Sequence, residues 1–204
     1  MTTTQPLTFE TRDSGEETAR ADLYGLLATL FHAPPSQALL DTIASARAEG
    51  EGILEHAWAD LVAACKKATS EQVREEYETL FVGVGKPEVM LYGSYYLSGF
   101  LMEKPLAELR TDLAAMGLER SEQVVESEDH IASLCEVMRY LIASDDVLHA
   151  NLPAQKKFFG THLQPWAGEM SAALKAHPKT RFYGVVASIA QEFFEIEAQA
   201  FDMT

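Results

Sequence analysis

Apolar residues recur at helical spacing along almost the whole chain, and this pattern constrains the fold more than any other feature. The stretch 131–142 is typical: its apolar residues are three or four positions apart and fall on one helical face. Similar stripes occur in 23–31, 54–65, 73–81 and 186–194. No stretch alternates apolar and polar residues, as a half-buried strand does. The sequence therefore predicts an all-α protein.

Proline and glycine divide this pattern into separate helices. Pro105, for example, can open a helix that Gly117 closes. Serine precedes several helices and can cap their first turns; the serines concerned are Ser36, Ser70 and Ser127. The chain has 204 residues and no linker between two compositions. We predict a single globular helical domain over 14–204, with about nine or ten helices, after a flexible N-terminus over 1–13.

Charge disfavours several classes of partner. The chain has 16 Lys and Arg against 31 Asp and Glu, a net charge of −15 with no basic region. Nucleic acid and anionic membrane surfaces are therefore disfavoured, and a basic partner is favoured. The longest apolar run, 89–102, is too short for stable membrane insertion, and residues 1–20 contain no apolar secretory signal. Cys65 and Cys135 sit at apolar helical positions, so we expect buried free thiols and a cytoplasmic location.

The densest group of polar residues is Glu126-Ser127-Glu128-Asp129-His130. Acidic residues at a helix start interact favourably with the helix dipole, and Ser127 is a typical N-cap, so a structural role explains the group. A metal site would need its ligands on one helical face, which these residues do not share. Alternatively, Glu126 and Asp129 can accept a guanidinium through charge-assisted hydrogen bonds.

Aromatic residues gather in 92–102, which include Tyr95, Tyr96 and Phe100. This segment is either a buried helix or the wall of a groove that binds an apolar peptide. A catalytic constellation is missing from the sequence: there is no GxSxG motif, and neither cysteine has a histidine at a family-like spacing. The Gly83–Lys86 loop lacks the phosphate-loop pattern, because Pro87 stands where Ser or Thr would hold Mg²⁺. We predict no catalytic residues and no metal.

Four motifs occur in order over about residues 20–200. They are Tyr24-Gly-Leu-Leu-Ala-Thr-Leu-Phe31 with Pro34, Glu76-Tyr-Glu-Thr-Leu-Phe-Val-Gly83, Glu126-x-x-Asp129-His130-Ile131, and Phe158-x-x-x-His162-Leu163-x-Pro165-Trp166. In this order and spacing they resemble the TorD/DmsD family of cytoplasmic chaperones for molybdoenzymes. One position departs from the family pattern: Ser127 stands where the family usually has proline.

The resemblance implies an all-helical fold, with domain exchange into dimers in some members. It implies a protein that binds the twin-arginine signal peptide, or the body, of an exported molybdenum oxidoreductase. The client is then held until its molybdopterin cofactor is inserted. Residues matching the Asp-His and His-x-x-Pro-Trp motifs are associated with signal-peptide binding. Weak guanine-nucleotide binding is suggested for some members, although this sequence has no nucleotide motif.

Combining the residues with the resemblance, we predict a chaperone and not an enzyme. Its expected partners are the precursor of a molybdopterin-dependent oxidoreductase and its twin-arginine leader, and it is expected to be a monomer or a domain-swapped dimer. The predicted binding residues are Glu126, Glu128 and Asp129 for the arginines, with His130 orienting Asp129 or bonding a client carbonyl. For the apolar stretch they are Tyr95, Tyr96, Phe100, Leu163 and Trp166, and the resemblance adds His162 and Pro165 of the His-x-x-Pro-Trp motif. Titration of His130 near neutral pH would make binding pH-dependent. Two alternatives remain: a small GTP-binding or GTP-hydrolysing helical protein, and a permanent structural subunit of an oxidoreductase complex.

Overall fold

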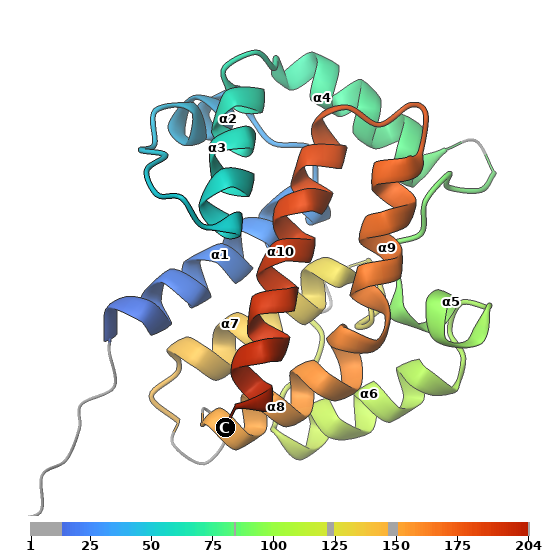
Figure 1. Cartoon of the computed structure of the whole chain (residues 1–204). Coiled ribbons are helices and arrows are strands. Elements are labelled where there is room, and N and C mark those ends of the chain that lie inside the picture. The colour runs from blue at the N-terminus through green and yellow to red at the C-terminus, as the bar shows by residue number, and fades with distance from the viewer. Residues whose placement is uncertain (1–13, 84, 122–124, 147–150, 204) are drawn as a thin grey trace, which may run out of the picture.

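The computed structural model describes residues 14–83, 85–121, 125–146 and 151–203, and these residues fold almost entirely into helices (Figure 1). In chain order the helices are α1 (Ser14–His32), α2 (Gln37–Ala44), α3 (Ile53–Cys65), α4 (Ser70–Tyr77), the π-helical turn η1 (Glu78–Val82), α5 (Gly93–Ser98), α6 (Lys104–Ala115), α7 (Ile131–Ala143), α8 (Leu152–Phe158), the π-helical turn η2 (Phe159–Leu163), α9 (Gln164–Ala176) and α10 (Phe182–Asp202). The predicted all-α class and number of helices are confirmed. The predicted flexible segment 1–13 lies outside the described residues.

The pairing of extended backbone within these residues is limited to one isolated antiparallel bridge, between Tyr92 and His130. None of the described helices combines the length and apolar character needed to cross a membrane.

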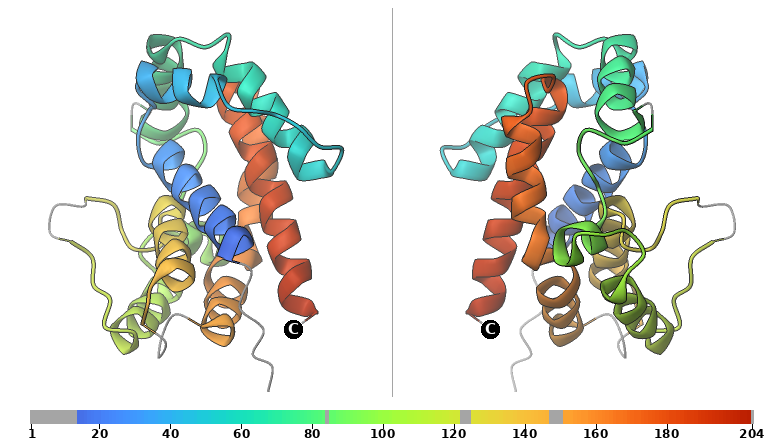
Figure 2. Two further views of the ribbon diagram at one scale, coloured as in Figure 1. Left: turned by 90° about the vertical axis from the view of Figure 1, so that its left-hand side faces the viewer. Right: turned by 90° about the vertical axis from the view of Figure 1, so that its right-hand side faces the viewer.

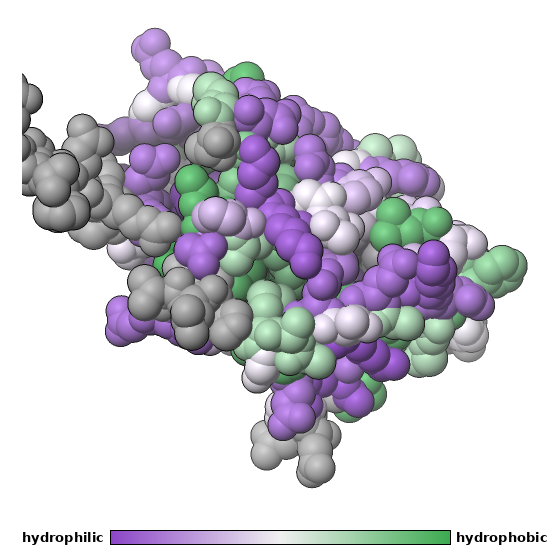
Figure 3. All heavy atoms as spheres, turned by 90° about the horizontal axis from the view of Figure 1, so that it is seen from below, coloured by the Kyte–Doolittle hydropathy of each residue, from purple (hydrophilic) through white to green (hydrophobic). Residues whose placement is uncertain are grey.

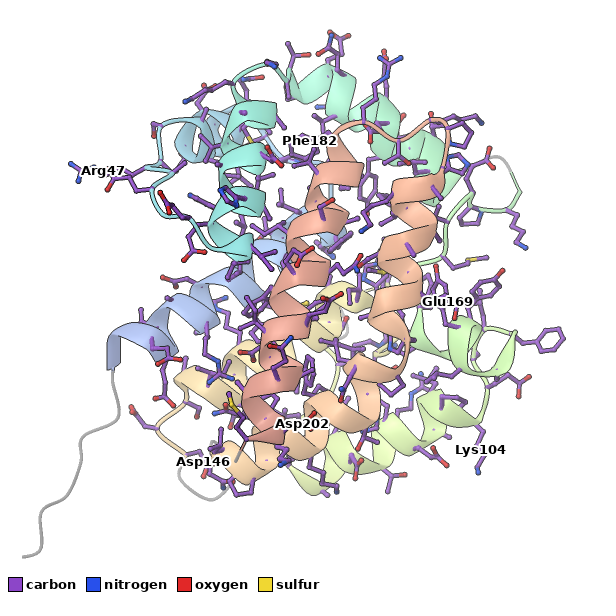
Figure 4. The ribbon with its side chains drawn as sticks, viewed as in Figure 1. Arg47, Lys104, Asp146, Glu169, Phe182 and Asp202 are labelled. Atoms are coloured by element: carbon purple, nitrogen blue, oxygen red, sulfur yellow. The ribbon has the colours of Figure 1, made fainter. Side chains whose placement is uncertain are left out.

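Two helix contacts organise the core. The α1 and α7 helices pack side by side, and α10 packs between α3 and α9 (Figure 1). In Figure 4, Phe182 and Asp202 mark the two ends of α10, which runs nearly the full height of the molecule. Aromatic side chains fill the junction of α1 with α10, where the rings of Tyr24 and Phe193 meet edge to face at 4.7 Å. The apolar stripes predicted from spacing therefore form one buried cluster.

A buried ion pair also joins α1 to α10. The Arg20 guanidinium donates to both carboxylate oxygens of Glu197, at 2.7 and 2.8 Å, although Glu197 is only 2% exposed. The hydroxyl of Tyr24 donates to the same carboxylate at 3.1 Å, and Arg20 also donates to the side chain of Gln155 at 3.2 Å. Gln155 in turn donates to the carbonyl of Leu141. The network thus connects α1, α7, α8 and α10.

Residues of the second family-like motif hold helix ends together. The carboxylate of Glu76 accepts hydrogen bonds from the backbone N–H groups of Arg181, Phe182 and Tyr183, at 2.8 to 2.9 Å. Three donors at the start of α10 are therefore satisfied by one side chain from α4. The hydroxyl of Tyr77 donates to the carbonyl of His32 at 2.8 Å, at the end of α1.

Both cysteines are buried and free, as predicted. Burial raises the pKa of the Cys65 thiol to about 11 and raises the pKa of Cys135 above its usual range. Both groups are therefore thiols at neutral pH, and they act as small apolar side chains.

Candidate functional site

The acidic segment 126–130 lies beside residues 91–93, immediately before α5. The Gly93 N–H donates to the carbonyl of Asp129 at 2.9 Å, and the Ile131 N–H donates to the carbonyl of Leu91 at 2.8 Å. These bonds flank the bridge between Tyr92 and His130. The fold therefore brings the predicted acidic cluster directly against the start of the predicted aromatic segment.

Asp129 is buried, with 4% of its surface exposed, and both of its carboxylate oxygens accept hydrogen bonds from the chain itself. One accepts from the Ser94 N–H at 2.8 Å and the other from the Ser127 hydroxyl at 2.6 Å. The carboxylate therefore holds the first turn of α5 in place. Its predicted contact with a client guanidinium would have to be made by a carboxylate that is buried and already hydrogen-bonded within the chain.

His130, not Ser127, is the N-cap of α7, so the prediction for Ser127 is wrong. The His130 Nδ1 accepts a hydrogen bond from the Ala132 N–H at 3.2 Å, and the side chain is 4% exposed. Burial lowers the pKa of His130 to about 4, against the opposing effect of Glu126 and Asp129. The predicted titration near neutral pH is also wrong, because burial and the capping bond both favour the neutral ring.

Glu128 is paired within the chain. Its Oε2 accepts from Arg110 Nε and Nη2 at 3.0 and 2.8 Å, and its Oε1 is 3.6 Å from Arg120 Nε. Partial burial opposes ionisation of Glu128, but the bonds from Arg110 outweigh it and lower the pKa of the carboxyl group. A client arginine would have to compete with two of the protein's own arginines.

Glu126 has a different environment from the other acids in the cluster. It is half-buried and lines a small cavity of about 90 Å³ together with aromatic side chains, among them Tyr77, Phe81, Tyr92 and His130. Burial and the Glu126 charge both raise the pKa of Tyr77, to about 12. Among the described residues, no lysine or arginine forms an ion pair with Glu126. A carboxylate against aromatic rings suits a cation, because rings and carboxylate both attract positive charge.

The predicted aromatic and His-x-x-Pro-Trp residues form a second connected group. Trp166 is 1% exposed, stacks on Tyr96 with ring centroids 5.5 Å apart, and donates to the carbonyl of His162 at 2.7 Å. A Cβ at Gly93 would lie 2.9 Å from Trp166 Nε1, so glycine is required where the indole meets α5. Buried His162 has its Nε2 2.8 Å from Asp112 Oδ2. The contacts of Trp166 with Tyr96 and Gly93 position α5 against α9, and the contact of His162 with Asp112 joins η2 to α6.

Three predicted residues are at the surface. Phe100 is 70% exposed, Pro165 is exposed in the first turn of α9, and Tyr95 is half-buried below Lys86. Figure 3 shows apolar residues at the edge of the molecule formed by α5 and the loop after it. Glu169, on the side of α9 that faces α5 in Figure 4, lines a depression of about 480 Å³ that includes both Tyr95 and Tyr96.

Sequence reasoning missed a larger apolar groove, which we call the α1–α7 groove. It has a volume of about 640 Å³ and is lined by α1, α7 and the segment that follows α6. Figure 2 (left) shows α1 and α7 crossing side by side. Its lining comprises Ala28, Thr29, His32–Ser36, Leu39, Leu113, Leu118–Ser121, Glu128, Ala132, Ser133, Glu136, Val137 and Tyr140. Of the predicted site residues, Glu128 alone lines it. The signal in the sequence is weak: small residues such as Ala28 and Ala132 on otherwise large apolar faces.

No group of three or more histidine, cysteine, aspartate or glutamate side chains within the described ranges is arranged to hold a metal ion.

Comparison with known proteins identifies similar chains. The model of a family described as the nitrate reductase delta subunit matches residues 50–172. The chaperone protein TorD of Vibrio cholerae is 25% identical over 203 residues, covering 90% of this chain and 92% of that protein. The TorD chaperone of Aliivibrio fischeri is 27% identical over 127 residues, and that match spans 58% of this chain and 59% of the relative.

A solved structure shows the same fold. It is a chain from Archaeoglobus fulgidus that is described as a redox enzyme maturation protein, with a TM-score of 0.57 and 18% sequence identity. The likeness covers 94% of this chain and 99% of that one. The helical arrangement therefore extends over nearly the whole of both proteins.

Proposed function

The chain belongs to the TorD family, which the nitrate reductase delta subunit model describes, and on this basis we propose that it is a maturation chaperone for a molybdopterin-dependent oxidoreductase. The family is one of chaperones and not of catalytic enzymes. Similarity to chaperones named TorD over nine-tenths of the chain supports this proposal. In it, the protein binds the twin-arginine leader of the precursor in the cytoplasm and holds the precursor until its cofactor is inserted.

The observation that supports leader binding is the setting of Glu126. Its carboxylate lines a cavity with tyrosine and phenylalanine rings, next to the buried bonds that fix Asp129 and His130. A guanidinium can donate to the carboxylate while it lies against a ring. In this proposal Glu126 contacts a leader arginine, whereas Asp129 and His130 keep the cavity in shape.

Replacing Glu126 by glutamine tests this contact. We expect Glu126→Gln to weaken binding of a synthetic twin-arginine peptide about tenfold or more, because a charge-assisted hydrogen bond is lost. Isothermal titration calorimetry measures the affinity. Glu51→Gln, at an exposed loop position, is the matched control for the change in net charge.

A second peptide, in which both arginines are replaced by glutamine, completes a double-mutant cycle between Glu126 and the peptide arginines. We expect this peptide to bind wild type and Glu126→Gln equally weakly, because the carboxylate then has no guanidinium to contact. Equal loss of affinity for both peptides would instead assign Glu126 a structural role. Unchanged affinity for the arginine peptide would disprove the contact.

The description of the family model favours one alternative, a permanent subunit of an oxidoreductase complex. Affinity purification from the native cytosol distinguishes the two functions. A chaperone is expected to co-purify with a precursor that still has its leader, at a level that falls once the cofactor has been inserted. A permanent subunit would be recovered at fixed stoichiometry with the mature, cofactor-loaded enzyme.

A further inference from the structure

We propose that a protruding apolar edge of the molecule binds the mature chain of the client while that chain is incompletely folded. This inference rests on the proposed function and adds a second surface to it. The apolar edge consists of Leu97 at the end of α5 and of Phe100, Leu101 and Met102 in the loop that follows. Leu97 and Leu101 are 43% exposed, Phe100 is 70% exposed and Met102 is 77% exposed. Four of the nine exposed large apolar side chains in the described part of the chain therefore lie within six residues.

The backbone holds these side chains outward in a defined loop. Met102 is the only residue other than glycine with a positive φ within the described ranges, at +60°, and its N–H donates to the Ser94 hydroxyl oxygen at 3.3 Å. The Ser98 hydroxyl donates to the carbonyl of Ser94 at 2.7 Å. A positive φ is unfavourable for a side chain as large as methionine, and such strain is found mostly where function requires it. Because Ser94 is itself fixed by Asp129, the loop and the candidate site share one support.

The apolar edge protrudes from the molecule and is not part of a groove. The α5 helix and the loop after it lie at the margin of the molecule, where α5 packs on α9 and α9 separates it from α10 (Figure 1). The four residues of the edge line none of the cavities described above. A protruding apolar loop can enter a hollow in a partner, whereas the apolar run of a leader needs a groove to surround it. The shape therefore favours the mature chain over the leader.

Charge at the edge differs from that of the rest of the chain. Residues 93–102 contain no charged side chain, although the whole chain has a net charge of −15, and the charges of Glu103 and Lys104 that follow cancel. A leader arginine is therefore not attracted here as it is at Glu126. The residues that a client buries on folding are apolar and uncharged, and aromatic and methionine side chains adapt to varied apolar partners. The edge thus suits apolar segments that the client exposes before it folds.

The size of the edge indicates a transient contact. Its four side chains expose roughly 500 Å² of apolar surface, which is within the range of about 300–600 Å² for the largest patch of a typical monomer. A stable dimer or a permanent subunit buries about 800 Å² per partner. Two copies of a chain with a net charge of −15 would also repel each other. The area fits a client that is held only until it buries its own apolar residues.

Removing part of the apolar edge tests the proposal. In the double variant Leu101→Ser/Met102→Gly, serine replaces one exposed apolar side chain, and glycine removes another while it adopts the positive φ without strain. The variant is therefore expected to fold at least as stably as wild type. Ile53→Ser is the matched control, because Ile53 is 68% exposed at the start of α3, which packs on α10 and not on α9 or α5.

Two probes distinguish the mature chain from the leader. One is the oxidoreductase that co-purifies with the chaperone, produced without its leader and without its cofactor, and the other is a synthetic twin-arginine peptide. Biolayer interferometry is expected to show at least about a tenfold loss of affinity of the double variant for the leaderless oxidoreductase, and less than about a twofold change for Ile53→Ser. Affinity for the twin-arginine peptide should change less than about twofold in both variants.

Photo-crosslinking tests whether the edge touches the client directly. The photoreactive residue p-benzoylphenylalanine in place of Phe100 should form crosslinks that mass spectrometry locates in the mature part of the oxidoreductase. The same group in place of Ile53, which is equally exposed, should not form them. Absence of crosslinks from position 100 while the oxidoreductase still binds would contradict the proposal.

The outcomes separate this inference from the proposed function. If the double variant binds the leaderless oxidoreductase as tightly as wild type, the apolar edge is not its site, and leader binding stands. If the variant instead loses the twin-arginine peptide, the edge belongs to the leader site and the inference is wrong. Crosslinks between two copies of the chain would assign the edge to a dimer, and sedimentation of wild type alone with phosphatidylcholine vesicles would assign it to a membrane. If no oxidoreductase co-purifies and wild type binds no twin-arginine peptide, the proposed function itself fails.

Discussion

Three buried polar side chains in the candidate site each satisfy a backbone group of a different element. Asp129 accepts from the start of α5, His130 accepts from the start of α7, and Trp166 donates to a carbonyl of η2. Replacing any of them changes the shape of the site as well as its chemistry. Loss of client binding in such variants does not by itself show contact with the client, whereas a variant of half-buried Glu126 tests contact more directly.

His130 gives the protein a specific dependence of stability on pH. Burial lowers its pKa in the folded state to about 4, below the value of about 6.5 in an unfolded chain. Between these values the unfolded state binds the extra proton, so stability falls as pH falls from about 6.5 to about 4. We expect this residue to contribute a loss of about 2–3 kcal/mol between neutral pH and pH ~4.5.

His130→Asn isolates this contribution, because asparagine can also cap α7 but does not titrate. Urea unfolding at both pH values gives the free energies. The variant should lose less stability on acidification than wild type by about 2–3 kcal/mol, since all carboxylates titrate in both proteins. Parallel losses in the two proteins would mean that His130 is protonated in the folded state.

At the scale of elements, the sequence predicts that a helix exists more accurately than it predicts the residues at which the helix begins and ends. Spacing identifies the helices, and Ser36 caps α2 as predicted, with its Oγ accepting from the Leu39 N–H at 3.2 Å. Thr69, not Ser70, caps α4, because Thr69 and Gln72 form a reciprocal capping box. When two adjacent residues both have capping side chains, the sequence does not show which of them is the N-cap, because this depends on the backbone dihedral angles.

The segment 89–102 shows a second limit. Its aromatic part, 92–102, is predicted as either a buried helix or a groove wall, and the structure forms there only a six-residue helix, α5, followed by an exposed loop. Gly99 adopts φ +82° and ends α5, and Met102 adopts φ +60° in the loop. The helix depends on a cap from Asp129, which is distant in sequence, so local spacing does not reveal its length.

The joint between α1 and α10 has a testable energetic consequence. Glu197 is 2% exposed, and Arg20 donates to both of its carboxylate oxygens. Arg20→Met removes the cation and leaves a buried carboxylate with the Tyr24 hydroxyl, so we expect a destabilisation of about 3–5 kcal/mol in chemical unfolding.

The double variant Arg20→Met/Glu197→Leu separates the desolvation cost from loss of the pair. With both charges replaced by apolar groups, we expect most of the lost stability to return, because burying a paired charge is itself costly. A double variant as unstable as Arg20→Met would show instead that the ion pair stabilises the joint by itself.

At the scale of the whole molecule, the site combines residues that the sequence separates. The family-like motifs and the aromatic segment 92–102 together mark parts of the chain that do meet: the 126–130 loop contacts 91–93, and Tyr96 stacks on Trp166 across 70 positions. Motif reasoning could not show which side chains are buried, and so it grouped paired Glu128 and buried Asp129 with Glu126. It also missed the α1–α7 groove, although two of the motifs contribute Ala28, Thr29, Pro34 and Glu128 to its lining, because the motifs do not show which faces of these segments meet.

The net charge of the whole molecule affects the rate at which the protein and a charged peptide associate. A charge of −15 attracts a cationic leader over distances comparable to the Debye length, which shrinks from about 30 Å at 0.01 M salt to about 8 Å at 0.15 M. We expect the association rate of a twin-arginine peptide to fall about tenfold across this range, and its dissociation rate to change little. Stopped-flow fluorescence measures both rates.

The same peptide with glutamines in place of its arginines provides the comparison. Without formal charge on these side chains, it loses the long-range attraction and keeps the apolar contacts, so its association rate should vary much less with salt. Equal salt dependence for the two peptides would show that the acidic surface keeps the chaperone dispersed without steering its client. A salt effect on dissociation alone would instead place the electrostatic contribution in the bound complex, at contacts such as Glu126 with a leader arginine.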